Sequence, residues 1–252
     1  MRRSIDLNSD LGEGAGNDQA IMPLISSANI ACGGHAGDEA TMRATIELAL
    51  RHGVSIGAHP GYADRANFGR LPVAMDPLAV IEEVSAQVRA LAEIASRAGA
   101  SLRHVKAHGA VYNQAERDDA IARSVATGIY DDARGAGLLV FAPAGSAMER
   151  AASAMDLRVA REGFVDRAYE ANGTLRSRRL PGAVHTDPQA AAAQALSFVR
   201  DGGVRAFDGS FLKLEVDTLC LHGDTPGAPA IAAAVRAALD REGIAVRPPH
   251  LP

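Results

Sequence analysis

Short apolar runs alternate along this chain with longer segments in which apolar residues recur every three or four positions. The short runs are typical of buried strands, and the longer segments are typical of amphipathic helices. The strands expected are Ser4–Leu7, Ala28–Cys32, Val54–Ala58, Leu102–Ala107, Leu138–Ala142, Leu157–Arg161 and Leu214–Leu221. The helices expected are Glu39–His52, a helix opened by Pro77 and closed by Gly99, Arg117–Arg134, Ser146–Ala154, Pro188–Arg200 and Ala228–Arg241.

This alternation predicts an α/β protein with a parallel sheet, because parallel neighbours need a crossover helix between them. Polar residues follow nearly every strand, and this favours a closed barrel in which all strand ends face one mouth. We therefore expect a single (β/α)7 TIM-like barrel that spans residues 1–252 as one domain. An open doubly wound sheet is the alternative.

Composition and charge indicate which classes of partner and which cellular compartment to expect. Hydrophobic residues make up 47% of the 252 residues, aromatic residues only 4%, and Trp is absent, so the core must be aliphatic. The net charge of −4 and the pI near 6.1 argue against nucleic acid as a partner. No apolar leader or bilayer-length span occurs, so we expect a soluble cytoplasmic protein that does not bind membranes. With only Cys32 and Cys220, two reduced thiols are expected.

Acidic residues gather at the end of the first strand. Asp6, Asn8 and Asp10 would point to one side of an extended chain, and Glu13 follows after Gly12. Clustered carboxylates raise one another's pKa, which can prepare a general base or create a site for a hard cation. The alternative is a loop whose acids cap turns.

Two histidines each follow a strand and precede a turn. His35 and His59, together with Asp10 from the first strand, would form a two-histidine, one-carboxylate set able to hold a divalent metal ion. The alternative is that both are hydrogen-bonded structural groups. Asp38 could instead orient the imidazole of His35.

Lysine is scarce, and this draws attention to Lys106. Of 26 basic residues only Lys106 and Lys213 are lysines, so a retained lysine can mark a need for a compact ammonium group. Lys106 and His108 share one face of an extended chain and suit an anionic substrate. A buried ion pair between Lys106 and a barrel carboxylate is the alternative.

Polar residues near other strand ends complete the expected site. The candidates for substrate binding are Asn8, Asn29, Asn113, Glu162, His222 and Asp224. Structural roles are the alternatives for this region: Asp224 or Thr225 would cap the last helix, and Asp166 would form an ion pair with Arg167. No phosphate-binding loop, dinucleotide fingerprint or serine-nucleophile elbow is present.

Five segments in a fixed order resemble the LamB/YcsF family. They are residues 6–14, 28–38, 57–61, 104–113 and 222–226, and the resemblance runs from Asp6 to Ile244. It implies a seven-stranded barrel similar to that of polysaccharide deacetylases, and a role as the A component of an ATP-dependent, three-component 5-oxoprolinase. Such an enzyme opens the lactam of 5-oxoproline to glutamate with ATP as co-substrate, and its other two components are the B and C subunits.

The family's pattern is not matched everywhere. Ser9, Gly34 and Glu39 stand where Cys, Phe and Pro are usual in the family. These differences change the shape of the pocket more than its charge, so they bear on substrate fit.

Under this hypothesis Lys106 and His108 steady the substrate's carboxylate or phosphate. Asp6, Asp10 or Glu13 activates water, and His35 or His59 shuttles protons. Two alternatives from other classes stay open. One is a metal-dependent deacetylase of carbohydrate-like amides that uses Asp10, His35 and His59. The other is a non-catalytic component that only delivers substrate.

Overall fold

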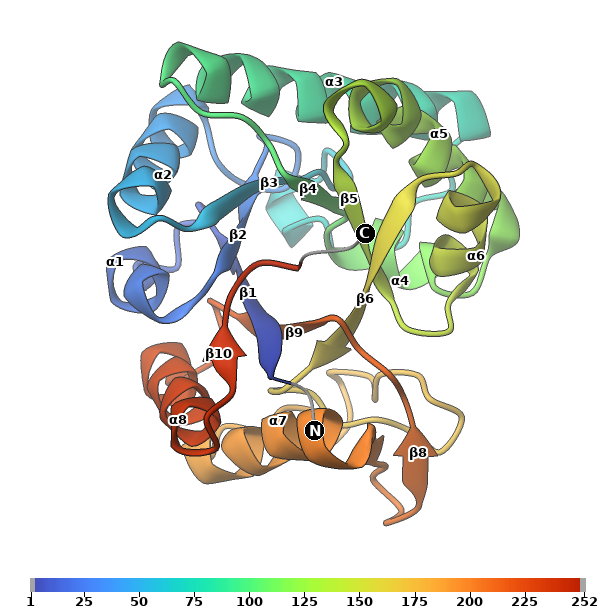
Figure 1. Cartoon of the computed structure of the whole chain (residues 1–252). Helices are drawn as coiled ribbons and strands as arrows, with labels where there is room; N and C mark the ends of the chain where they lie inside the picture. The colour runs from blue at the N-terminus through green and yellow to red at the C-terminus, as the bar shows by residue number, and fades with distance from the viewer. Residues whose placement is uncertain (1–2, 250–252) are drawn as a thin grey trace.

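Parallel strands form a closed barrel with helices around it, as Figure 1 shows for a computed structural model that describes residues 3–249. The barrel strands are β1 (Ser4–Leu11), β2 (Ser27–Ala31), β3 (Ser55–His59), β4 (His104–Lys106), β5 (Leu139–Pro143), β6 (Arg158–Phe164) and β9 (Thr218–His222). They pair in this order, and β9 closes the ring by pairing with β1. The predicted seven-stranded barrel is confirmed, and the open sheet is excluded.

Helices cover the outside of the barrel (Figure 1). They are α1 (Asp18–Ile21), α2 (Glu39–His52), α3 (Pro77–Arg97), α4 (Gly109–Ala115), α5 (Asp119–Ala136), α6 (Ala147–Ala154), α7 (Pro188–Asp201) and α8 (Ala228–Arg241), with 3-10 turns at Met22–Leu24 and Arg65–Asn67. Helix α2 begins where Asp38 accepts a hydrogen bond from the Thr41 amide and ends at Gly53, whose φ is 66°. The capping residues therefore fix its position, as predicted.

Several boundaries differ from the prediction. Strand β1 continues to Leu11, because neighbouring strands pair with it on both sides, whereas the first strand was expected to end at Leu7. The last barrel strand begins only at Thr218. It was expected to begin at Leu214. A separate strand, β8 (Phe211–Lys213), ends just before that residue and pairs with β7 (Gly203–Arg205) in an antiparallel hairpin. Helix α4 and β10 (Ala245–Val246), which pairs with β1, were not predicted.

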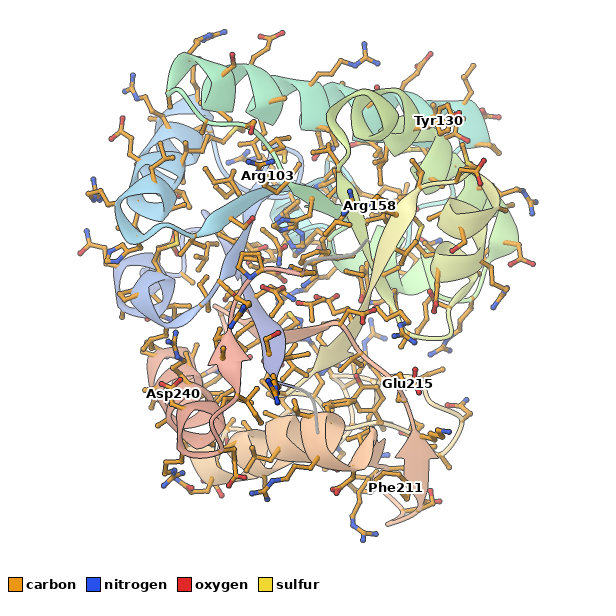
Figure 2. The ribbon with its side chains drawn as sticks, in the orientation of Figure 1. Arg103, Tyr130, Arg158, Phe211, Glu215 and Asp240 are labelled. Atoms are coloured by element: carbon orange, nitrogen blue, oxygen red, sulfur yellow. The ribbon has the colours of Figure 1, made fainter. Side chains whose placement is uncertain are left out.

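The core has two parts. A large aliphatic cluster fills the space between the strands and the helices. Leu139, Phe141 and Ala160 form a small separate cluster, with the Phe141 ring stacked 4.1 Å from that of His104. Cys32 and Cys220 are buried free thiols. Phe211 on β8 and Asp240 on α8 lie at the periphery, outside the ring of strands (Figure 2). None of the described helices is long and apolar enough to cross a membrane.

Candidate active site

Asp6 lies deep inside the barrel. Its carboxylate accepts hydrogen bonds from the hydroxyls of Ser26, Ser27 and Thr218, and the residue is 1% exposed. Burial raises the pKa of Asp6 to about 6, although these hydrogen bonds oppose the rise. Asp6 lines neither of the two cavities described below, and its three hydroxyl contacts favour a structural role over water activation.

An amide layer lies above Asp6. The Asn8 amide donates to Glu162 and to Thr218, and the Asn29 amide donates to Asn8 and to Asp10 at 2.7 and 2.8 Å. His104 Nε2 lies 2.8 Å from Asn29 Oδ1 and donates to it. This layer therefore holds the carboxylate of Asp10 from below.

Glycine makes room for the His104 ring in this layer. A Cβ added to Gly57 would lie 2.1 Å from His104 Nε2. No side chain fits at residue 57 unless the ring moves.

Lys106 stands above the amide layer, between two carboxylates. Its Nζ lies 2.9 Å from Asp10 Oδ1, 3.1 Å from Glu162 Oε1 and 3.0 Å from Cys220 Sγ. Burial alone would lower the pKa of Lys106, but its neighbours Asp10, Cys220 and Glu162 raise that pKa well above its usual value. Tyr112 donates its hydroxyl to Glu162 and so fixes the second carboxylate.

Asp10 is held as an anion. Burial alone would raise its pKa, but the charges of His59 and Lys106 hold the pKa well below its usual range. The predicted convergence of an acid, an imidazole and an ammonium group is present in the structure.

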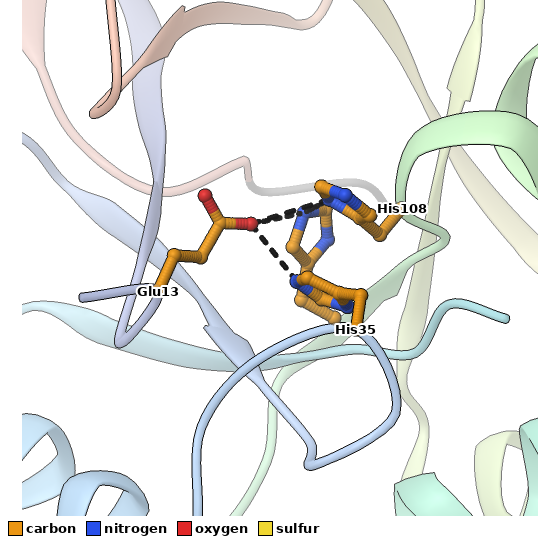
Figure 3. A group of neighbouring side chains, drawn as sticks. Glu13, His35 and His108 are labelled. Atoms are coloured by element: carbon orange, nitrogen blue, oxygen red, sulfur yellow. Dashed lines mark hydrogen bonds and ion pairs between the residues drawn. The ribbon is translucent and has the colours of Figure 1, made fainter. Parts of the chain in front are cut away.

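Three imidazoles and a carboxylate meet beside this ion pair. Glu13 Oε1 lies 3.0 Å from His35 Nε2, 3.2 Å from His108 Nδ1 and 3.7 Å from His59 Nε2. His59 Nε2 and His108 Nδ1 are 3.0 Å apart. Figure 3 shows the Glu13 carboxylate beside the rings of His35 and His108, with a dashed line to each. These two rings stack 3.6 Å apart. We call Glu13, His35, His59 and His108 the histidine cluster.

Burial governs the charge of most of these rings. It lowers the pKa of His35 to about 4 and also lowers that of His108. His59 differs: burial would lower its pKa, but the charge of Asp10 raises it. Burial would likewise raise the pKa of Glu13, but the imidazoles of His108 and His35 beside its carboxylate hold the pKa below its usual range.

A cavity of about 660 Å³ opens above Lys106. Of the predicted site residues, Asp10, His59, Lys106, His108, Asn113 and His222 line it. Glu13 and His35 line a second cavity of about 300 Å³. The predicted site residues Asp6, Asn8, Asn29 and Glu162 do not line the first cavity. Glu162 lies behind the lining, where it contacts Lys106 and Tyr112.

Arginines dominate the outer wall of the larger cavity. Those lining it are Arg70, Arg117, Arg167, Arg176, Arg178 and Arg179. Three of them have acidic neighbours, since Arg70 pairs with Asp224, Arg117 with Glu116 and Arg176 with Glu170. None of the six was predicted to line the cavity. Four of them lie in residues 166–187, which have no periodic pattern that would place them at the mouth.

Contacts near the last strand correct three structural expectations. Asp166 accepts hydrogen bonds from His222 and Thr225 instead of pairing with Arg167, which donates to backbone carbonyls. Asp224 pairs with Arg70, and the N-cap of α8 is Gly227, so neither Asp224 nor Thr225 caps that helix.

Asp38 does not orient His35. It caps α2 and lies on the surface, and the partner of His35 is Glu13.

The donor set available to a metal ion also differs from the predicted one. The donor atoms of Glu13, His35, His59 and His108 all lie within 4.8 Å of one another. Asp10, predicted as a ligand, is engaged by Lys106, and its Oδ2 lies 3.3 Å from His59 Nε2. Glu13 and His108, which were predicted as catalytic, thus replace Asp10 in this donor set.

Known proteins that are similar to this chain match it over nearly its whole length. The chain is 48% identical to the 5-oxoprolinase A subunit of Bordetella pertussis over 98% of this chain and 99% of that protein. It is 51% identical to the protein of the same name from Chloroflexus aggregans over the same shares. A crystal structure of a lactam utilization protein from Thermus thermophilus superposes with a TM-score of 0.90, at 43% identity, over 97% of this chain and 99% of that one.

More distant similarity concerns the fold alone. The T48 deacetylase structure, at 13% identity and a TM-score of 0.51, has a similar barrel over 96% of this chain and 86% of that one. Residues 5–251 match the LamB/YcsF family, so the chain belongs to the LamB/YcsF family.

Proposed function

We propose that this protein opens the lactam ring of 5-oxoproline to glutamate, as the A component of an ATP-dependent 5-oxoprolinase. The observation that carries the proposal is the buried ammonium group of Lys106 at the base of an arginine-rich cavity, in a chain about half identical to proteins of that name. 5-Oxoproline is a small carboxylate, and its activation by ATP adds a phosphate. Both groups are anions that such a cavity suits.

The chemistry explains why ATP is required. A lactam is a poor electrophile, and transfer of the γ-phosphoryl group of ATP to its oxygen gives an imidate phosphate and ADP. Water adds to the imidate carbon, and the C–N bond breaks once the ring nitrogen has gained a proton. This leaves glutamyl phosphate, and a second water releases phosphate and glutamate. Two water molecules and one ATP are consumed for each ring opened.

The cavity residues match the needs of these steps. Lys106 places a cation where negative charge accumulates on the activated lactam oxygen, and it holds protons at Nζ within the cavity. Asp10 and Glu162 fix the position of that ammonium group from two sides. The arginines of the outer wall attract the substrate's carboxylate or phosphate.

The phosphorylation step requires a nucleotide site that partner proteins would supply. It has no phosphate-binding loop, so we assign phosphorylation to the B and C subunits and the handling of the activated lactam to this chain. Equilibrium binding of ATP to the isolated chain tests this division. We expect no saturable binding at millimolar ATP, and micromolar affinity would contradict the division.

The assay for the whole proposal is glutamate release from 5-oxoproline by the three components together. We expect release only when ATP and all three components are present, with one ADP formed per glutamate. Acetate release from an N-acetylated sugar by this chain alone would instead support the deacetylase. Turnover that persists after replacement of Lys106 would support a component that only delivers substrate.

A further inference from the structure

We propose that Glu13, His35, His59 and His108 form a binding site for a divalent transition-metal ion. The proposal concerns the histidine cluster alone and does not depend on the lactamase assignment, because ion binding is measured without substrate or partner proteins.

The backbone fixes which nitrogen of two rings carries a proton. His59 Nδ1 lies 2.8 Å from the carbonyl oxygen of Lys106, and His108 Nε2 lies 2.9 Å from that of Phe68. A carbonyl oxygen only accepts, so each of these nitrogens donates an N–H group. In the neutral rings the opposite nitrogens, His59 Nε2 and His108 Nδ1, therefore carry lone pairs. Backbone carbonyls orient metal-binding histidines in this same way.

Those two lone pairs converge on each other and on a carboxylate. The two nitrogens are 3.0 Å apart, and Glu13 Oε1 lies 3.2 and 3.7 Å from them. Three electron-rich atoms at this separation repel one another unless a proton or a metal ion lies between them. Ligand bonds of about 2.0–2.2 Å in a tetrahedral zinc site place neighbouring donors about 3.3–3.6 Å apart. The observed separations lie close to that spacing.

His35 supplies the fourth donor. Its Nε2 lies 3.0 Å from Glu13 Oε1, and its Nδ1 is buried without a hydrogen-bond partner among the described residues. No contact at Nδ1 fixes the tautomer of this ring, so Nδ1 can carry the proton and leave the lone pair on Nε2, which faces the cluster.

Glycines clear the space around the stacked rings. A Cβ at Gly69 would lie 2.8 Å from His35 Cβ, and a Cβ at Gly61 would lie 3.0 Å from both His108 and His35. The backbone of the connection between β3 and α3 is therefore shaped to fit these imidazoles.

Solvent access and the local charge both favour the histidine cluster as the metal site. Glu13 and His35 line the smaller cavity and His59 and His108 the larger one, so an ion can enter and a substrate can reach it. A second set of potential ligands, Asp10, Cys220 and His222, is less suitable. The Lys106 ammonium group lies 2.9 Å from Asp10 and 3.0 Å from Cys220 and repels a cation there.

The donor types indicate the class of ion. Imidazole and carboxylate ligands suit zinc, iron, cobalt and nickel, whereas magnesium and calcium prefer oxygen alone. With such an ion bound, the imidazoles hold it instead of shuttling protons, and the ion would polarise water or a carbonyl oxygen.

The test is cobalt binding by the full untagged chain after treatment with a chelator. We expect one equivalent of Co²⁺ to give the visible absorption of a four- or five-coordinate ion, and one equivalent of Zn²⁺ to displace it. Glu13→Gln and His108→Gln should each weaken Co²⁺ binding about 100-fold or more, since even indirect ligand changes cost about 10–100-fold. His52→Gln, at an exposed histidine, should leave binding unchanged.

Three outcomes would overturn the proposal. One is the absence of stoichiometric cobalt binding by the folded wild-type chain. Another is unchanged affinity in both Glu13→Gln and His108→Gln. The third is a cobalt–thiolate charge-transfer band that Cys220→Ser abolishes, which would place the ion at the second set of ligands. Circular dichroism of each variant separates loss of binding from loss of fold.

Discussion

Two carboxylates on strand β1, four residues apart, lie in opposite environments. Asp6, in the lower layer of the barrel, meets three hydroxyl groups, and burial raises its pKa to about 6. Asp10, in the upper layer, meets Lys106 and His59, and their charges hold its pKa well below its usual range. The same side chain on the same face of one strand is thus a structural acid at the base and a permanent anion at the mouth. The neighbouring strands decide which.

Removing the Lys106 ammonium group from the upper layer should have the largest effect on activity and stability. Lys106→Met leaves Asp10 and Glu162 buried without their cation, so we expect kcat/KM for glutamate release to fall about 100-fold or more. Stability should fall by about 3–5 kcal/mol. Lys213→Met, at the other and exposed lysine, is the matched control and should change neither. Similar activities for the two variants would remove Lys106 from the mechanism.

The amide layer between the two carboxylates should be nearly as sensitive. Gly57→Ala places a Cβ only 2.1 Å from His104 Nε2, so the ring must move and release Asn29. We expect a loss of about 3 kcal/mol in urea unfolding. Ser55→Ala, on the same strand, should cost less than about 1 kcal/mol. Equal losses would show that the barrel interior accommodates the extra methyl group.

Asp6 should make stability fall as pH rises. Its pKa is raised in the folded state, so its contribution is fully present below the unfolded value of about 3.9 and is lost as pH rises through about 6. Integrated over that window, the effect is about 3 kcal/mol. Urea unfolding of wild type and Asp6→Asn between pH 4 and 8 measures it: the wild type should lose stability relative to the variant as pH rises. A constant difference would contradict the raised pKa.

Asp166 should give the opposite pH dependence of stability, with a smaller effect. Burial would raise the pKa of Asp166, but His222, through its charge and its hydrogen bonds, and the hydroxyl of Thr225 hold that pKa below the unfolded value. Its contribution is therefore present above about pH 4 and is lost as pH falls. Asp166→Asn should cost about 1–2 kcal/mol at pH 7 and progressively less toward pH 3. Asp240→Asn, on the exposed face of α8, should cost less than about 1 kcal/mol at pH 7.

The sequence was sufficient to predict the barrel and the meeting of its strand ends. Turn residues and apolar runs are local signals, and parallel pairing brings the ends together whatever lies between them. That reasoning placed Asp10, His59 and Lys106 in one cavity. Asp6 and Asp10 share a face, so period-two alternation could not tell which of them reaches the mouth.

The remainder of the site depends on contacts that local pattern does not encode. Glu13 reaches the histidine cluster because the chain turns at Gly12, where φ is 73°. Arg167 and Arg176 come from an irregular loop, and Cys220 meets Lys106 only because β9 closes the barrel. Each of these placements is set by tertiary packing between segments far apart in the chain.

The most direct test compares Asp10→Asn with Asp6→Asn in ATP-dependent glutamate release by the three-component enzyme. Both changes replace a buried carboxylate by an amide of the same shape on one strand. We predict that Asp10→Asn lowers kcat/KM about 100-fold or more, while Asp6→Asn lowers it less than about 3-fold. A loss in Asp6→Asn as large as that in Asp10→Asn, with both variants folded, would contradict the assignment of the upper layer as the active end of the barrel.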